Sequence, residues 1–174
     1  IQASTTIDQY GGIGRAFYLF DTSSIPDTNT VSAATLSLYG TGKIDVPGWT
    51  PNTDIYTSSP ASNTALVLAD YDQVGTTSQT GSPISYASWS TTGYNDFTFN
   101  ATGIGNISKT GVSKFSSRNA QYDVANSPPT YFSGGNYSQP SSSFADTAGT
   151  TQDPKLVVTY SLPVAASRYS IIVG

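Results

Sequence analysis

Apolar and polar residues alternate along several short segments of this chain, and no segment shows the period of about 3.6 residues that an amphipathic helix requires. In residues 94–100, Phe97 and Phe99 alternate with polar neighbours, and residues 31–39 alternate in the same way. Clusters of Gly, Pro, Asn and Asp separate these segments, as turns separate strands. The pattern predicts an all-β protein, a jelly-roll-like antiparallel β-sandwich with at most one short helix.

The other elements follow from the same pattern. We expect further strands at residues 15–20, 54–57, 112–118 and 155–160, and one short helix at residues 101–108 with Asn100 as its N-cap. The segment 15–20 is apolar enough to be buried on both faces. Residues 119–153 hold too few aliphatic side chains for a core of their own, so we expect a single domain over residues 1–174.

The residue types that are missing exclude most catalytic chemistry. The chain contains no His, Cys, Met or Glu, so its eleven acidic residues are all Asp. Without imidazole or thiol there is no Ser–His or Cys–His nucleophile, no His or Cys metal ligand and no disulfide. An Asp-based hydrolase would need one buried acid facing a second carboxylate, and no pair in the sequence is marked for that role. We expect a protein that is not an enzyme and has no cofactor.

The distribution of charge excludes two classes of partner. The net charge is −4, and the seven Lys and Arg residues are scattered along the chain, so nothing in the sequence resembles a nucleic-acid-binding surface. No run of about 20 apolar residues is present, so we expect no membrane span. Ser and Thr account for 50 of the 174 residues. Such a neutral hydroxyl-rich surface suits a secreted protein, and we expect an extracellular location on a cell or virion surface.

An ordered set of segments carries a resemblance to a known family. The segments are Arg15–Pro26, Val31–Tyr39 and Pro154–Tyr160, with Gly93–Asn100, Ile104 and Gly111 between them. In this order they resemble the DNRLRE (disaggregatase-related) β-sandwich domains of microbial and viral surface proteins, over residues 13–161. The resemblance implies a jelly-roll sandwich displayed outside the cell, with a structural, adhesive or carbohydrate-binding role. It implies no catalytic residues.

Both ends of the chain depart from that family. Its members carry a first strand well before the Arg-x-Phe motif, but only fourteen residues precede Arg15 here. Conversely, the domain should close at Tyr160, yet residues 161–174 follow and include a β-branched apolar stretch after Pro163. We therefore expect one strand to be missing at the front and a surplus strand to follow the domain.

A sandwich that lacks a strand leaves unpaired backbone groups at one edge, and a strand from another copy can fill that edge. The candidate donors are the N-terminal arm, residues 1–12, and the C-terminal extension, residues 162–174. The residues expected to make the contact are Ile1, Ala3, Thr5, Ile7, Arg168, Tyr169, Ser170, Ile171, Ile172 and Val173. The alternative is that both ends pair within their own subunit. Head-to-tail pairing of copies need not close, so donation predicts a filament.

Aromatic and Asn residues outside the strands suggest sites of other kinds. Trp and Tyr rings stack on sugars, and the candidates for carbohydrate binding are Trp49, Trp89, Tyr131 and Tyr137. The alternative is that these rings fill the ends of the sandwich. Three Asn-x-Ser/Thr motifs predict glycosylation at Asn100, Asn106 and Asn136.

The densest acidic spot in the sequence is Asp70-Tyr71-Asp72. Ca²⁺ takes six to eight oxygen ligands, and paired Asp residues with nearby carbonyls are typical of its sites. Asp70 and Asp72 are therefore candidate ligands of a structural calcium. The alternative is that they form a solvated turn.

These observations together favour a non-enzymatic extracellular structural protein. We expect a subunit of a filament or similar surface assembly, built by donor-strand exchange between copies. The alternative function is a carbohydrate-binding or adhesive module of a larger surface or virion fibre protein, with surface glycans as its partners.

Overall fold

The computed structural model describes residues 1–162 except 7, 131–135, 147 and 150. Its elements are β1 (Gln2–Ala3), β2 (Tyr10–Gly12), β3 (Ala16–Asp21), β4 (Thr30–Asp45), β5 (Asn52–Thr57), a 3₁₀ turn η1 (Leu68–Asp72), β6 (Ile84–Ser85), β7 (Tyr94–Thr98), α1 (Ala101–Gly105), β8 (Val112–Asn119), β9 (Ser138–Ser142) and β10 (Lys155–Ser161). All paired strands are antiparallel. The predicted all-β class is confirmed.

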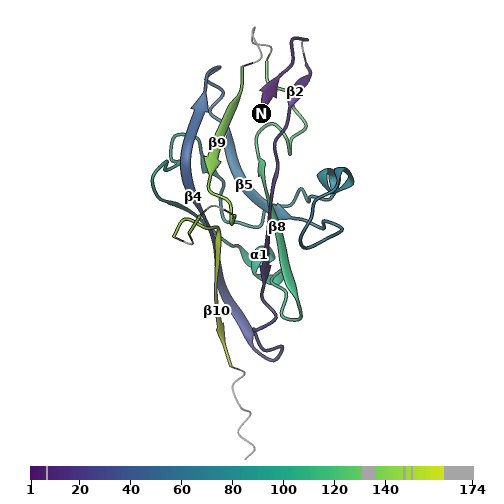
Figure 1. Cartoon of the computed structure of the whole chain (residues 1–174), viewed down its shortest axis with the longest axis vertical. Coiled ribbons are helices and arrows are strands. Elements are labelled where there is room, and N and C mark those ends of the chain that lie inside the picture. Colours follow the sequence, from purple (N-terminus) through teal and green to yellow (C-terminus); the bar gives the residue numbers. More distant parts are fainter. Residues whose placement is uncertain (7, 131–135, 147, 150, 163–174) are drawn as a thin grey trace, which may run out of the picture.

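Two sheets form the body of the molecule (Figure 1). The first sheet has the strand order β10-β4-β7, and β9 also pairs with β4. The second sheet has the order β3-β8-β5-β6. The short strands β1 and β2 form a separate hairpin close to one end of the elongated molecule, and β10 runs to the opposite end (Figure 1).

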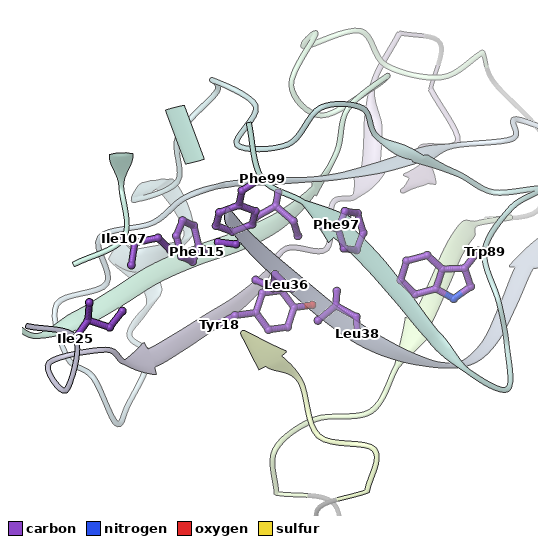
Figure 2. Packing of buried hydrophobic residues seen from close by; sticks show 11 residues of the cluster. Tyr18, Ile25, Leu36, Leu38, Trp89, Phe97, Phe99, Ile107 and Phe115 are labelled. Atoms are coloured by element: carbon purple, nitrogen blue, oxygen red, sulfur yellow. The ribbon is translucent and has the colours of Figure 1, made fainter. Parts of the chain in front are cut away.

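The core lies between the two sheets. Leu36 and Phe97 come from the first sheet and Tyr18 and Phe115 from the second, and their side chains meet in one cluster (Figure 2). Phe115 packs edge-on against Phe99, with ring centroids 4.9 Å apart. Alternation along the strands therefore points one row of apolar side chains inward from each sheet, as the sequence predicts.

Two strands differ from the sequence-based expectation. β4 runs to Asp45, six residues beyond the predicted end at Tyr39, because β9 pairs with its second half. β3 is buried at one position only, Tyr18, and the expectation that it is buried on both faces is wrong. The physical reason is its place in the sheet: β3 is an edge strand and has a neighbour on one side only.

The strands β9 and β10 occupy successive stretches of β4. β10 pairs with residues 30–37 of β4, and β9 pairs with residues 40–45. The backbone N–H of Ser143 donates to the carbonyl of Tyr39 at 2.9 Å, so the chain follows the same edge of β4 as it leaves β9. These two strands thus form one edge of the first sheet, interrupted by the segment between them (Figure 1).

One lateral side of the sandwich is closed by the chain itself. Residues 74–85 lie between β5 of the second sheet and β7 of the first. The N–H of Gln79 donates to the carbonyl of Ile55 at 2.9 Å, and the N–H of Gly81 donates to that of Thr98 at 3.1 Å. We call this the closed side, because one segment satisfies backbone groups of both sheets.

The helix α1 follows β7 and lies beside the segment that forms the closed side. Asn100 caps it as predicted, since its side-chain oxygen accepts from the N–H of Gly103 at 2.9 Å. The amide nitrogen of Asn100 donates to the carbonyls of Ser78 and Thr80 at 3.1 and 2.7 Å. A single side chain thereby joins the helix to the segment that closes the sandwich.

Candidate functional site: the open side of the sandwich

The opposite side of the sandwich lies between β3 and the β9–β10 edge, and we call it the open side. All six residues of β3 lie opposite residues of β8, and the same register continues to Thr22, whose N–H donates to the carbonyl of Gly111. In this antiparallel register the even-numbered residues of β3 are therefore the ones that hydrogen-bond to β8. The backbone groups of Phe17, Leu19 and Asp21 consequently point away from β8. Within the described part of the chain, no strand pairs with this second edge of β3.

Partly buried apolar side chains lie on both strands that border the open side. Ala16 and Phe20 on β3, and Leu156 and Val158 on β10, pack against the core and stay partly exposed. β10 also has no described strand on its second edge. An uncovered pair of sheet edges flanked by apolar side chains is the arrangement that an added strand completes.

A cavity of about 330 Å³ opens between β3 and β9. Its apolar wall includes Tyr18, Leu38 and Trp89, and its polar wall includes Ser117 and Ser138. By volume it has room for about ten water molecules at roughly 30 Å³ each. The cavity reaches the core, because Leu38 and Trp89 are both members of the core cluster.

Two polar atoms of residues that line this cavity have no partner within the described structure. They are the indole Nε1 of Trp89 and the hydroxyl of Ser138, and the two residues are 4% and 1% exposed. Buried polar groups are normally hydrogen-bonded, so each unpaired one calls for an explanation. Both residues line the cavity, but these two atoms are themselves closed off from solvent.

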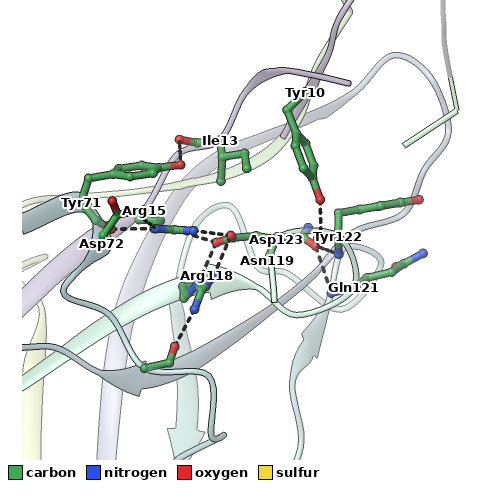
Figure 3. Close-up of polar contacts among 11 residues, drawn as sticks. Tyr10, Ile13, Arg15, Tyr71, Asp72, Arg118, Asn119, Gln121, Tyr122 and Asp123 are labelled. Carbon is green, nitrogen blue, oxygen red and sulfur yellow. Dashed lines mark hydrogen bonds and ion pairs between the residues drawn. The ribbon is translucent and has the colours of Figure 1, made fainter. Parts of the chain in front are cut away.

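A buried ion-pair network holds the start of β3 in place (Figure 3). The carboxylate of Asp123 accepts two bonds from Arg15, at 2.9 and 2.6 Å, and two from Arg118, both at 2.8 Å. Arg15 also donates to the carbonyl of Tyr71, and Arg118 donates to that of Gly75. The network therefore joins the residue before β3, the end of β8 and the segment that includes η1.

The electrostatics of this network favour the ionised carboxylate. Burial by itself would raise the pKa of Asp123, but the hydrogen bonds from Arg118 and Arg15 outweigh burial, so the pKa of Asp123 lies below its ordinary value. Sequence reasoning did not find Asp123 or Arg118. The available signal was an Arg at the end of an expected strand in a chain with few charges.

The N-terminal arm pairs within its own subunit. β1 pairs with β2, and Ala3 is buried. Ile1 and Ser138 exchange two backbone hydrogen bonds, both of 2.9 Å, so the arm covers the start of β9. Thr5 lies exposed in the turn of the hairpin. Ile7 and the C-terminal candidates, residues 168–173, lie outside the described residues.

The candidate sugar-binding rings do not form a common surface. Trp89 is buried in the core, and Trp49 packs against Tyr122 with ring centroids 6.1 Å apart. Tyr137 is exposed, and Tyr131 lies outside the described residues. The end-filling alternative thus describes both Trp residues better, and carbohydrate binding stays a prediction.

The three glycosylation motifs lie in different environments. The amide nitrogen of Asn100 donates to the carbonyls of Ser78 and Thr80, so a glycan attached to that nitrogen would displace at least one of these two bonds. Asn106 is exposed, although its amide donates to Gln79 at 2.6 Å. Asn136 is half-buried. Modification at these sites stays a prediction, and the contacts of Asn100 argue against that position in the folded chain.

The structure does not bring Asp70 and Asp72 together as ligands. The buried carboxylate of Asp70 accepts from the N–H groups of Val67 and Ala61, which hold its pKa below the ordinary value. Asp72 points to solvent and lies 3.8 Å from Arg15. Among the described residues there is no group of three or more acidic side chains suited to a metal. The exposed side chain of Asp72 agrees with the solvated-turn alternative. The buried side chain of Asp70 does not, because it binds backbone N–H groups of its own chain.

Among the described residues, no helix is long and apolar enough to cross a membrane. No protein-family model matches the sequence, and no curated protein or solved structure is similar enough to count as a match. The functional conclusion therefore depends on the geometry of the open side.

Proposed function

We propose that this protein is a subunit of an extracellular assembly in which each copy donates a strand to the open side of the next. The proposal is carried by the free edge of β3, which borders a cavity that reaches the core. The added strand would pair with the backbone groups of Phe17 and Leu19 and cover the apolar side chains beside them.

The closed side supplies the precedent for this arrangement. There, residues 74–85 lie between the two sheets and bond to both, as shown by the contacts of Gln79 and Gly81. The open side has two sheet edges and no such segment within the described chain. The same backbone chemistry that closes one side is therefore available on the other side to a strand from outside.

The donor that fits best is the segment 168–173. The N-terminal arm is already paired within its own subunit, which leaves the C-terminal extension of the two candidates. In that extension Tyr169, Ile171 and Val173 fall on one face of an extended strand. Burial of three such side chains contributes on the order of 5–7 kcal/mol before the cost of ordering.

The resemblance to surface β-sandwich domains, the neutral hydroxyl-rich composition and the absence of imidazole and thiol support an extracellular, non-catalytic role. β10 ends at the opposite end of the molecule from the N-terminal hairpin (Figure 1). A donor that leaves one end and an acceptor that extends toward the other suit head-to-tail addition, which need not close into a ring.

Engineered cysteines test the proposal without cross-links from native thiols, because the chain has no Cys. One variant carries Leu19→Cys at the free edge, and a second carries Ser170→Cys or Ile172→Cys, which would lie on the same outer face of the added strand. Mixing the two under oxidising conditions should give a disulfide-linked dimer, seen on a non-reducing gel and located by mass spectrometry.

The matched control is Thr98→Cys, an exposed position on β7 at the closed side. It should give far less cross-linked dimer with either tail variant. Equal yields from Leu19→Cys and Thr98→Cys, or a single-sized monomer at all protein concentrations in sedimentation, would contradict strand donation.

A further inference from the structure

An exposed apolar loop on the flank of the molecule takes no part in the proposed strand exchange. Leu66, Val67 and Leu68 are 58%, 56% and 94% exposed, and we call these three residues the apolar tip. We infer that the apolar tip is a contact surface between copies of this chain, in which the tips of neighbouring filaments pack against each other. This inference rests on the proposed function and adds to it the side-by-side association of filaments.

Buried polar contacts hold the loop that carries the apolar tip. The carboxylate of Asp70, which is 2% exposed, accepts from the N–H groups of Ala61 at 2.8 Å and Val67 at 2.9 Å. Arg15 donates to the carbonyl of Tyr71 at 2.7 Å and lies over its ring, 4.2 Å from the centroid. The loop is therefore tied to its own buried carboxylate and to the start of β3, so a partner has little of it left to order, which lowers the cost of binding.

The chemistry of the apolar tip selects an apolar partner. Residues 61–69 contain no charged side chain. Within the described part of the chain, no other run of three large apolar residues is exposed, and the remaining exposed ones are separated in the sequence. Exposed apolar groups that cluster in this way mark interaction sites. The best-matched surface that a second copy offers is its own apolar tip, and packing about a two-fold axis covers both tips together.

The position and size of the apolar tip favour contact between filaments. Head-to-tail addition uses the two ends of the elongated molecule, whereas η1, which begins at Leu68, projects from its flank (Figure 1). Stable complexes bury about 800 Å² per partner, with about 20–30 residues a side, far more than three side chains supply. A single tip contact is therefore too weak to hold two subunits together, but a filament repeats it along its length, so many such contacts act at once.

Leu68→Ser in the full-length chain tests the inference. It should weaken each tip contact about tenfold or more, the value of burying one Leu side chain. Electron microscopy should then show single filaments under conditions in which the unmodified chain forms bundles. Each copy has a net charge of −4, so the copies repel one another, and bundling of the unmodified chain should increase with added sodium sulfate, which screens charge and strengthens apolar contacts. Light scattering over a salt series measures this.

Two controls separate the contact from folding and from general loss of apolar surface. Leu68 is 94% exposed, so Leu68→Ser should leave the urea midpoint unchanged. Val46→Ser is the matched control, since Val46 is 53% exposed and lies outside the apolar tip, and it should leave bundling unchanged. Leu68→Cys locates the contact, because two-fold packing brings each residue 68 close to its equivalent and oxidation should link them. Adding Leu66→Ser to this variant should reduce the linked dimer several-fold.

The outcomes distinguish this inference from the proposed function. If Leu19→Cys cross-links to the tail while Leu68→Ser bundles as readily as the unmodified chain, strand donation stands and the tip contact is wrong. If Leu68→Ser instead reduces only the binding of the chain to phosphatidylcholine vesicles, the apolar tip binds lipid and the inference is overturned. If Leu19→Cys forms no cross-link with the tail, the proposed function fails, and side-by-side association of filaments fails with it.

Discussion

The two sides of the sandwich have similar sheet edges but different neighbours. On the closed side, residues 74–85 bond to both sheets, and Asn100 ties that segment to α1. On the open side, β3 and β10 each end a sheet with no further described strand, and a cavity of about 330 Å³ lies between β3 and β9. The comparison separates edges that are bonded within the subunit from edges that have no further described strand beside them.

The open side needs a different source of rigidity, and the ion-pair network provides it. An edge strand has half of its backbone groups free, so its position depends on contacts at its ends. Arg15 lies directly before β3, and Asp123 holds it together with Arg118. The free edge of β3 is thus anchored by buried charge, whereas the closed side is anchored by backbone pairing.

The substitution with the largest expected effect is Asp123→Asn. It leaves two buried guanidinium groups without their counter-charge, and we expect the free energy of unfolding to fall by about 3–5 kcal/mol. Urea denaturation measures the change. The control is Asp72→Asn, whose carboxylate is exposed and 3.8 Å from Arg15, with an expected loss below about 1 kcal/mol. Equal losses in the two variants would show that the buried network does not anchor β3.

A smaller effect is expected from Gly103→Ala on the closed side. A Cβ at this position would lie 2.2 Å from the carbonyl oxygen of Gln79, so the helix and the closing segment would have to separate. We expect a loss of about 1–3 kcal/mol, measured by thermal and urea unfolding. Gly105→Ala in the same helix meets no atom within 4 Å and should stabilise by about 0.5–1 kcal/mol. A stabilising Gly103→Ala would mean that the closed side is not tightly packed.

The smallest effect is expected on the free edge of the first sheet. Val157 on β10 is 56% exposed, so Val157→Thr should change the unfolding free energy by less than about 0.5 kcal/mol. The same variant, compared at high and low protein concentration, shows whether this outer face of β10 takes part in assembly. A loss above about 1 kcal/mol in dilute protein would indicate that β10 is already covered within the subunit.

The strands were predictable because their signal is local. Phe97 and Phe99 alternate with polar residues, and the structure buries both. Asn100 was identified as a cap from its residue type and its position before the helix, and it caps α1. An apolar run need not be part of a sheet. Leu66, Val67 and Leu68 lie exposed in the segment that leads into η1.

The site was only partly predictable, because its parts come from distant segments. A missing strand was inferred from the two ends of the chain, yet the free edge belongs to β3, in the interior of the sequence. Asp123 lies 108 residues from Arg15, and no local pattern connects them. The Ser-rich sequence around Trp89 is typical of a loop, but in the structure Trp89 is buried beside the cavity.

By itself, the sequence determined the class of fold and the range of chemistry. Alternation within single strands sets which side chains face inward, and a chain without His, Cys or Glu cannot build the sites that need them. Only the tertiary structure decided which edges are paired. That choice depends on hydrogen bonds between segments far apart in the chain. Backbone groups are nearly the same in every residue type, so the sequence does not show whether they have a partner.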